Sequence, residues 1–279
     1  MRVYISVDME GIAGVDHPKP TEPGDVRYPV AVDLMVGEAN AAIEGAFAGG
    51  ATDVLVNDSH SSMYNLLPDR IDPRARLLRG QKAWSMVAGA LPGPGGEAAF
   101  DVALFVGYHA RAGHPRGTIA HTYSDEPVET RLAGRPTGEY GVNALALGAW
   151  GIPVGMVAGD DALADEVGGW LPWAECVVVK EADGGRSAIS VHPTVADDRV
   201  RAGAERAVRR ASAGELKVLT VESPVVIDVE FVTGMAADYA AIAPGAERVG
   251  DRGVRYTSDD PIIAFRGFLT GVRLAGIVG

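Results

Sequence analysis

The chain has 279 residues, 47% of them hydrophobic and 22% charged, which is typical of a folded globular protein and not of a disordered one. A formal net charge of −12, without any run rich in Lys and Arg, argues against a nucleic-acid-binding protein. No leader pattern is apparent at the N-terminus, and no apolar stretch approaches the roughly 20 residues of a membrane span, so we expect a cytoplasmic protein.

Strand-like apolar runs alternate with helix-like segments in chain order. Residues 2–8 predict a buried strand, and residues 28–50 predict a helix because apolar residues recur there every three or four positions before a glycine pair. Residues 128–136 predict a hairpin with its turn at Ala133-Gly134. Further strands are predicted at 52–58, 75–80, 100–109, 152–161 and 175–181, and further helices from 84, over 138–151 and over 162–171. The lone Cys176, which excludes an internal disulfide, lies in the last of these strands, and we expect a buried, unreactive thiol.

This alternation predicts an α/β fold with a mostly parallel sheet covered by helices on both faces. The pattern changes after about residue 193, where a strongly charged helix at 195–214 leads into an apolar segment at 218–232. We therefore expect a larger α/β domain over residues 1–193 and a smaller C-terminal α+β part over residues 194–279.

Polar side chains gather where the predicted strands end. Asp8 and Glu10 follow the first strand, His60 follows the second, and His109 ends the strand at 100–109. Ligands of open parallel sheets bind beyond these carboxyl ends. Two neighbouring carboxylates repel each other unless a cation lies between them. Carboxylate and imidazole without thiolate suit Zn²⁺, Mn²⁺ or Co²⁺, so the pattern predicts a metal site.

Each of these residues also has a purely structural explanation. Asp8 and Glu10 could serve a turn and a helix cap, and a histidine after a strand is often a satisfied core residue. Asp58 could orient His60 or stabilise the loop beside it. His114 lies close enough to His109 to be a rival ligand. We expect the acidic pair at 160–161 to cap the helix that follows.

Five segments together resemble one known family. SVDMEGIAG at 6–14, VLVNDSHSSMYNL at 54–66, GYHARAG at 107–113, HT at 121–122 and PTGEYGVNA at 136–144 occur in this order. Their combination is similar to the zinc-dependent D-aminopeptidases of the DppA type, which are found in dipeptide-transport operons. The likeness runs over residues 1 to about 190 and more weakly beyond. It identifies residues 1–193 as the expected metal-binding catalytic domain.

The resemblance implies two zinc ions per subunit. On its pattern, Asp8 corresponds to the carboxylate that bridges both ions and Glu10 to a ligand of one of them. His60 and His109 correspond to the imidazole ligands, and Glu139 to the last carboxylate ligand. The resemblance leaves open which ion each terminal ligand binds.

His121 corresponds to the histidine that the family is thought to use in catalysis. The resemblance suggests a nucleophile, but the cations already activate water, so an acyl-histidine would add a step. An imidazole can take up and release protons near neutral pH, and we expect a general acid/base or an oxyanion donor. The chain departs from the family at His114 and at the turn 93–98, and both changes could alter the pocket without removing a ligand.

The expected function is hydrolysis of the N-terminal residue from short peptides, with D-amino-acid peptides such as D-Ala-D-Ala as substrates. The alternatives are an L- or β-peptide aminopeptidase, an amidase acting on another small amide, and a dipeptide- or metal-binding protein without turnover. A phosphoesterase would need a cluster of basic residues for phosphate, and none is apparent. The resemblance further implies a ring-shaped homo-oligomer, such as a decamer of two stacked pentamers.

Overall fold

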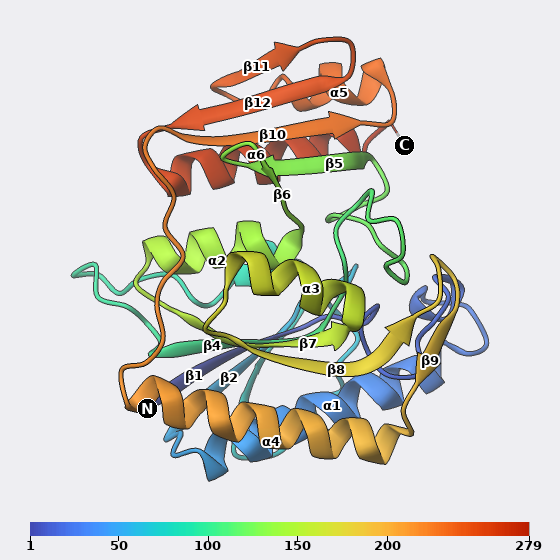
Figure 1. Ribbon diagram of the computed structural model, residues 1–279, viewed down its shortest axis with the longest axis vertical. Helices are drawn as coiled ribbons and strands as arrows, with labels where there is room; N and C mark the ends of the chain where they lie inside the picture. The colour runs from blue at the N-terminus through green and yellow to red at the C-terminus, as the bar shows by residue number, and fades with distance from the viewer. Residues whose placement is uncertain (279) are drawn as a thin grey trace.

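The computed structural model describes residues 1–278 and contains two β-sheets with helices between and around them (Figure 1). The larger sheet has seven strands in the order β3-β2-β1-β4-β7-β8-β9, and all neighbours are parallel except β8 and β9. Its strands are β1 (Arg2–Val7), β2 (Asp53–Asp58), β3 (Arg76–Leu78), β4 (Val102–Tyr108), β7 (Val154–Asp160), β8 (Glu175–Ala182) and β9 (Ala188–Ser190). The predicted α/β class with a mostly parallel sheet is confirmed.

Helices cover both faces of the larger sheet, as predicted. Helices α1 (Tyr28–Ala48) and α4 (Pro193–Ser212) lie side by side on one face, and α2 (Glu139–Ala149) and α3 (Asp161–Trp170) cover the other (Figure 1). Gly45 permits the close packing of α1 on α4, because a Cβ there would lie 2.1 Å from the carbonyl oxygen of Arg201. Strands buried from both sides must be apolar throughout, which explains their continuous hydrophobic runs.

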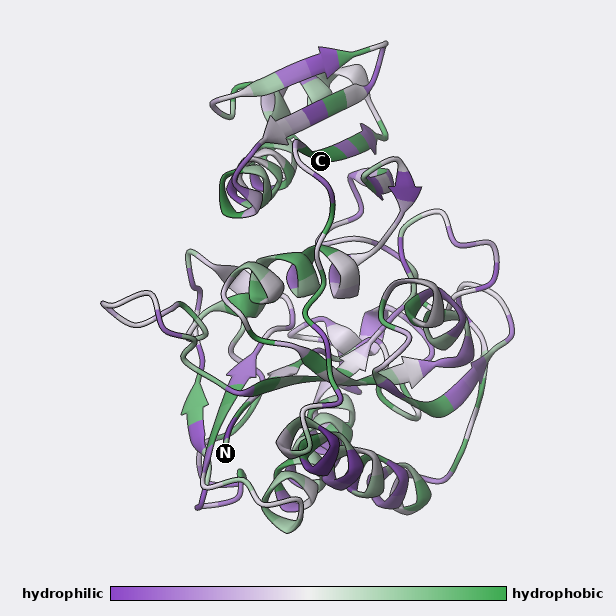
Figure 2. Cartoon of the chain, turned by 60° about the vertical axis from the view of Figure 1, so that its left-hand side comes forward, coloured by the Kyte–Doolittle hydropathy of each residue, from purple (hydrophilic) through white to green (hydrophobic). Residues whose placement is uncertain are grey.

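The smaller sheet is antiparallel, with the order β11-β12-β10-β5-β6. Its elements are β5 (Pro127–Leu132), β6 (Arg135–Pro136), β10 (Val225–Phe231), β11 (Ala246–Val249), β12 (Gly253–Ser258), α5 (Gly234–Ala240) and α6 (Pro261–Ala275). The predicted hairpin is confirmed, and Ala133 and Gly134 both have positive φ, as a two-residue type I′ turn requires. Along these strands hydrophilic and hydrophobic residues alternate (Figure 2), because one face is buried and the other faces solvent.

The two sheets do not divide the chain at residue 193. Strand β5, from the middle of the chain, pairs with β10 of the smaller sheet, and β6 pairs with β5 at its edge. Helix α4, which follows the expected boundary, packs on α1 under the larger sheet. Its charged appearance conceals a buried stripe of small and β-branched residues, Ala196, Val200, Gly203, Ala204, Ala207 and Val208. That stripe makes α4 a layer of the larger sheet.

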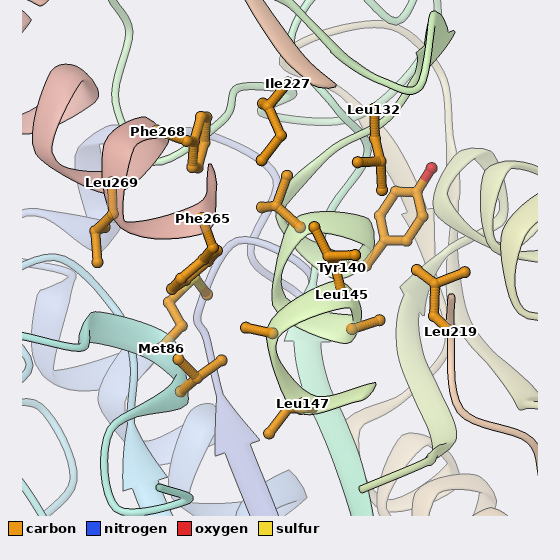
Figure 3. Close-up of a cluster of buried hydrophobic side chains, with 14 of the residues drawn as sticks. Met86, Leu132, Tyr140, Leu145, Leu147, Leu219, Ile227, Phe265, Phe268 and Leu269 are labelled. Atoms are coloured by element: carbon orange, nitrogen blue, oxygen red, sulfur yellow. The ribbon is translucent and has the colours of Figure 1, made fainter. Parts of the chain in front are cut away.

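A continuous apolar cluster joins the two sheets. Leu145 and Leu147 of α2 lie in the same buried cluster as Phe265 and Phe268 of α6, with Ile227 of β10 behind them (Figure 3). Helix α2 is therefore covered by the larger sheet on one side and by α6 on the other. No helix within residues 1–278 has the length and hydrophobicity needed to cross a membrane.

Two local predictions were wrong. The segment from residue 84 forms only a 3₁₀ turn, η2 (Ser85–Val87), because Ser85 has a positive φ and the backbone is already extended at Ala88. Cys176 is exposed instead of buried, because it lies at the start of β8, where α3 covers the strand incompletely. Its Sγ lies 4.0 Å from the carbonyl oxygen of Ala164 in α3.

Candidate metal centre

Three adjacent strand ends supply the centre. β1 lies between β2 and β4, so Asp8, His60 and His109, which follow these strands, meet at one edge of the sheet. Glu10 lies in the loop after β1, and Glu139 is the first residue of α2. All five side chains are buried. The structure thus brings together the five residues that the resemblance implied as metal ligands.

Glycine lets the loop after β1 approach β4. The Gly11 N–H donates to the carbonyl oxygen of Gly107 at 2.7 Å, and a Cβ at Gly11 would lie 1.8 Å from the carbonyl oxygen of Tyr108. Any larger residue would push the loop away from the strand. The glycine that follows Asp8 and Glu10 in the sequence therefore holds both carboxylates against His109.

Asp8 lies between two histidines and offers a different oxygen to each. Its Oδ1 is 3.3 Å from Nδ1 of His60, and its Oδ2 is 3.5 Å from Nε2 of His109. Oε2 of Glu10 lies 3.0 Å from the same Nδ1 of His60, and Oε2 of Glu139 lies 3.5 Å from the same Nε2 of His109. The centre therefore has two halves that share Asp8.

Carbonyl oxygens orient the imidazoles. Nε2 of His60 donates to the carbonyl of Thr21 at 3.0 Å, and Nδ1 of His109 donates to that of Ala110 at 3.0 Å. Nδ1 of His121 donates to the carbonyl of Ile119 at 2.9 Å. Because a carbonyl oxygen only accepts, the proton of each neutral ring lies on the bonded nitrogen. The lone pair of each ring then faces the carboxylates.

His121 occupies the outer edge of the centre. Its ring stacks on that of His109, with 4.1 Å between centroids, and its Nε2 lies 3.8 Å from Oε1 of Glu139. It is 21% exposed, whereas His60 and His109 are almost fully buried. His109, His121 and Glu139 form one group whose ligand atoms lie within 4.8 Å of one another, and Asp8, Glu10 and His109 form a second.

The electrostatics of the centre favour a cation. Burial raises the pKa of the Asp8 carboxyl, and the charge of Glu10 raises it further. Burial opposes a charge on His109, yet the carboxylates of Glu139 and Asp8 outweigh it and raise the pKa of the ring well above its usual range. A divalent cation would replace the protons that the carboxylates otherwise hold on the imidazoles.

One buried atom shows that the residues suit a metal ion. Nε2 of His109 is buried and makes no hydrogen bond with any part of the chain that the structure describes, although two carboxylate oxygens lie 3.5 Å away. An unpaired buried nitrogen is costly unless a ligand satisfies it. Imidazole and carboxylate donors without thiolate suit Zn²⁺ at a catalytic site.

The structure also settles the open alternatives around the centre. The Asp58 carboxylate accepts from the backbone N–H groups of Asn65 and Leu66, at 2.5 and 2.7 Å, so it stabilises the loop and does not orient His60. Asp160 caps α3, as expected, by accepting from the N–H of Leu163 at 2.8 Å. Nδ1 of His114 accepts from backbone N–H groups of its own loop and belongs to neither ligand group.

Two buried charged residues that sequence reasoning missed support the loop of Glu10. Nζ of Lys180 in β8 donates to the carbonyl oxygens of Glu10, Ile12 and Val15. Glu38 of α1 accepts from the N–H of Ala13 at 2.8 Å. The sequence did contain a signal for Lys180, which directly follows the apolar run Val177–Val179. A strand buried on both faces excludes an ammonium without partners, so such a lysine must bind polar groups inside the protein.

The centre opens into a cavity of about 760 Å³. Within residues 1–278, six residues other than glycine have positive φ. Five of them line this cavity: Ser61, Met63, Ser85, Ile119 and Tyr123. Such backbone conformations are costly and persist where the surrounding structure enforces them, typically at functional sites. This concentration of strain, together with the buried ligands, marks the cavity as the candidate active site.

Comparisons with known proteins place the chain among D-aminopeptidases. The family model described as D-aminopeptidase, Peptidase_M55, matches residues 1–270. The D-aminopeptidase of Bacillus subtilis (strain 168) is 35% identical over 277 residues, which cover 99% of this chain and 98% of that protein. The solved structure of the Zn-dependent D-aminopeptidase DppA from Bacillus subtilis, described as a self-compartmentalizing protease, superposes with a TM-score of 0.90 at 34% identity, covering 99% of this chain and 98% of the other.

Proposed function

This chain belongs to the D-aminopeptidase family, and from that membership we propose that it is a di-zinc aminopeptidase that removes the N-terminal D-residue from short peptides such as D-Ala-D-Ala. The observation that carries the proposal is the unpaired Nε2 of His109 between the carboxylates of Asp8 and Glu139. Zinc dependence and action on D-peptides are stated for the Bacillus subtilis relative, and high coverage at 35% identity supports their transfer.

Five side chains would hold the metal: Asp8, Glu10, His60, His109 and Glu139. Asp8 would bridge two ions, because its two oxygens face different histidines. Glu10 and His60 lie on one side of it, and His109 and Glu139 on the other. When bound, two zinc ions lower the pKa of water and polarise the scissile carbonyl, which are two requirements of peptide hydrolysis.

His121 would carry the proton. With its Nδ1 hydrogen donated to the Ile119 carbonyl, its Nε2 lone pair is free to take a proton on the cavity side of Glu139. The same nitrogen can then return the proton to the leaving amine. The greater exposure of His121 supports this role, because a ring that meets substrate must line the cavity. An acyl group trapped on His121 in a single-turnover quench would contradict this assignment.

We also propose a cytoplasmic, ring-shaped homo-oligomer. The relative is described as self-compartmentalizing, and two large apolar side chains beside the small sheet, Ile242 after α5 and Ile263 in α6, are 67% and 55% exposed. Burial of these side chains between subunits would stabilise an assembly. Size-exclusion chromatography with light scattering measures the mass of the assembly in solution. A monomer at all protein concentrations would reject the proposed oligomer.

The first test is a matched pair of hydrolysis assays with D-Ala-D-Ala and L-Ala-L-Ala, each with zinc supplied and then chelated. Zinc-dependent release of alanine from the D-peptide alone is expected. Cleavage of the L-peptide instead would keep the metal chemistry and overturn the stereochemistry. Absence of cleavage of either peptide would overturn the proposed substrate.

The second test measures metal per subunit. His60→Ala is expected to lose at least one of two zinc ions, because it removes the imidazole beside Asp8 and Glu10. His192→Asn is the matched control, since His192 is an exposed helix cap whose role asparagine can keep. Full zinc content and full activity in His60→Ala would reject the ligand assignment.

A further inference from the structure

Two positively charged residues from distant parts of the chain line the cavity of the metal centre. Lys82 lies in the loop before η2, and Arg273 lies in the last turns of α6. The two Arg273 nitrogens donate to the carbonyl oxygens of Lys82 and Ala83, at 2.8 and 3.1 Å. The small-sheet helix therefore fixes the backbone that presents Lys82 to the cavity.

The Lys82 ammonium has no acidic partner. Its Nζ donates to the carbonyl oxygen of Asp58 at 2.8 Å, and no carboxylate of residues 1–278 forms an ion pair with it. Lys82 is half-buried, and this burial lowers the pKa of its ammonium to about 8, so the group is still mainly protonated at neutral pH. An ammonium has three donors, and Asp58 occupies one of them. A partly desolvated cation with free donors gains from binding an anion.

The Lys82 ammonium is anchored close to the metal centre along the chain and shares its cavity. Lys82 bonds to the backbone of Asp58, and His60 follows only two residues later in the chain. Two extended residues span at most about 7 Å, so the Asp58 carbonyl that anchors Lys82 lies within about one dipeptide length of the His60 backbone. The cavity lining includes the carboxylates of the metal centre, Asp8, Glu10 and Glu139, and two cations, Lys82 and Arg273. A peptide with free termini carries the complementary pair of charges.

We propose that Lys82 binds the C-terminal carboxylate of the substrate and thereby selects short peptides with a free C-terminus. This inference rests on the proposed peptidase function of the same cavity. Arg273 acts as a positioning residue, because it holds the backbone of Lys82. The site would favour dipeptides over longer chains, whose carboxylate would lie beyond the reach of Lys82 once the scissile bond is at the metal centre.

The test compares D-Ala-D-Ala with its C-terminal amide, which lacks the negative charge. In the zinc-loaded wild type, kcat/KM is expected to be about 10- to 100-fold higher for the free acid, the range of one charge-assisted hydrogen bond. In Lys82→Met this preference should fall to near unity, because the acid loses a charged contact that the neutral amide does not make. Lys82→Arg should keep part of the preference. Lys217→Met, an exposed lysine outside the cavity, is the matched control.

A binding measurement separates failure of this inference from failure of the proposed function. Calorimetry measures the binding of the acid and of the amide to zinc-loaded His121→Ala and to the double variant His121→Ala/Lys82→Met. This measurement does not depend on turnover. Tighter binding of the acid that disappears with Lys82→Met would uphold the carboxylate site even if no peptide were hydrolysed. Equal loss for acid and amide in Lys82→Met, or a preference for the acid that survives it, would overturn the site and leave the hydrolase intact.

Discussion

The two sheets of this protein treat charge in opposite ways. The larger sheet is buried on both faces and places its carboxylates and histidines at one edge, inside the protein, where they are held by carbonyl oxygens and by one another. The smaller sheet buries one face on α5 and α6 and carries ion pairs such as Asp228–Arg255 on its exposed face. Charge is therefore functional where parallel strands end and mainly solvating where antiparallel strands face water.

The largest difference between the sheets should appear when a charged or polar residue is removed from each. His109→Ala removes the imidazole that contacts both Asp8 and Glu139, and we expect loss of zinc and a fall in kcat/KM of more than about 100-fold, beyond what an outer-sphere partner costs. Metal analysis and steady-state kinetics measure this. Retention of metal and activity would contradict the assignment of the larger sheet as the catalytic one.

The apolar cluster between the sheets tests whether they unfold separately. Phe268 of α6 is fully buried and packs edge-on against Tyr123, with 5.5 Å between ring centroids. Phe268→Ala should lower the free energy of unfolding by about 3–5 kcal/mol, and Phe268→Leu by less. Because one cluster spans both sheets, urea unfolding should remain a single transition in fluorescence and circular dichroism. A separate early transition would show that the smaller sheet is an independent unit.

A buried acid under the larger sheet predicts a pH dependence. Burial raises the pKa of Glu38 to about 8, above its usual value near 4.5. The folded protein then binds a proton that the unfolded chain has released, so the contribution of Glu38 to stability falls as pH rises from about 4.5 to 8. Glu38→Gln removes this loss. We expect the unfolding free energy of the variant, relative to that of the wild type, to increase by a few kcal/mol between pH 5 and 8, at about 1.4 kcal/mol per pKa unit.

That gain is measured as the difference in unfolding free energy between the two proteins at pH 5, 6.5 and 8, with metal chelated in both. Glu44→Gln, at an exposed position of the same helix, is the matched control. A difference that stays constant with pH for Glu38→Gln would reject the raised pKa.

The smallest effect is expected on the exposed face of the smaller sheet. Arg255 pairs with Asp228 across β12 and β10, with Nε 2.6 Å from Oδ1, but its side chain is 42% exposed. Arg255→Met should change the unfolding free energy by less than about 1 kcal/mol and leave kcat/KM unchanged. A larger loss of stability, measured by urea unfolding, would show that this face is buried in the assembled protein.

Much of the larger sheet could be predicted from local pattern. The strands ending near residues 7, 58, 108 and 160 and the helices α1 to α3 follow from apolar periodicity, and in the smaller sheet the Ala133-Gly134 turn follows from glycine turn chemistry. The pairing of β5 with β10 was not predictable in this way, because it joins residues about 100 positions apart. The helix expected from residue 84 failed for a local reason, the positive φ of Ser85 and the extended backbone at Ala88.

The sequence by itself determined the kinds of donor at the centre, since Asp8, Glu10, His60 and His109 sit where their own strands end and the order of such ends is limited in a parallel sheet. The tertiary structure alone decided what holds and orients them. Thr21 fixes the ring of His60, Lys180 fixes the loop of Glu10, and Arg273 reaches the loop of Lys82 from the other end of the chain. Such contacts depend on the packing of whole elements, so no local pattern encodes them.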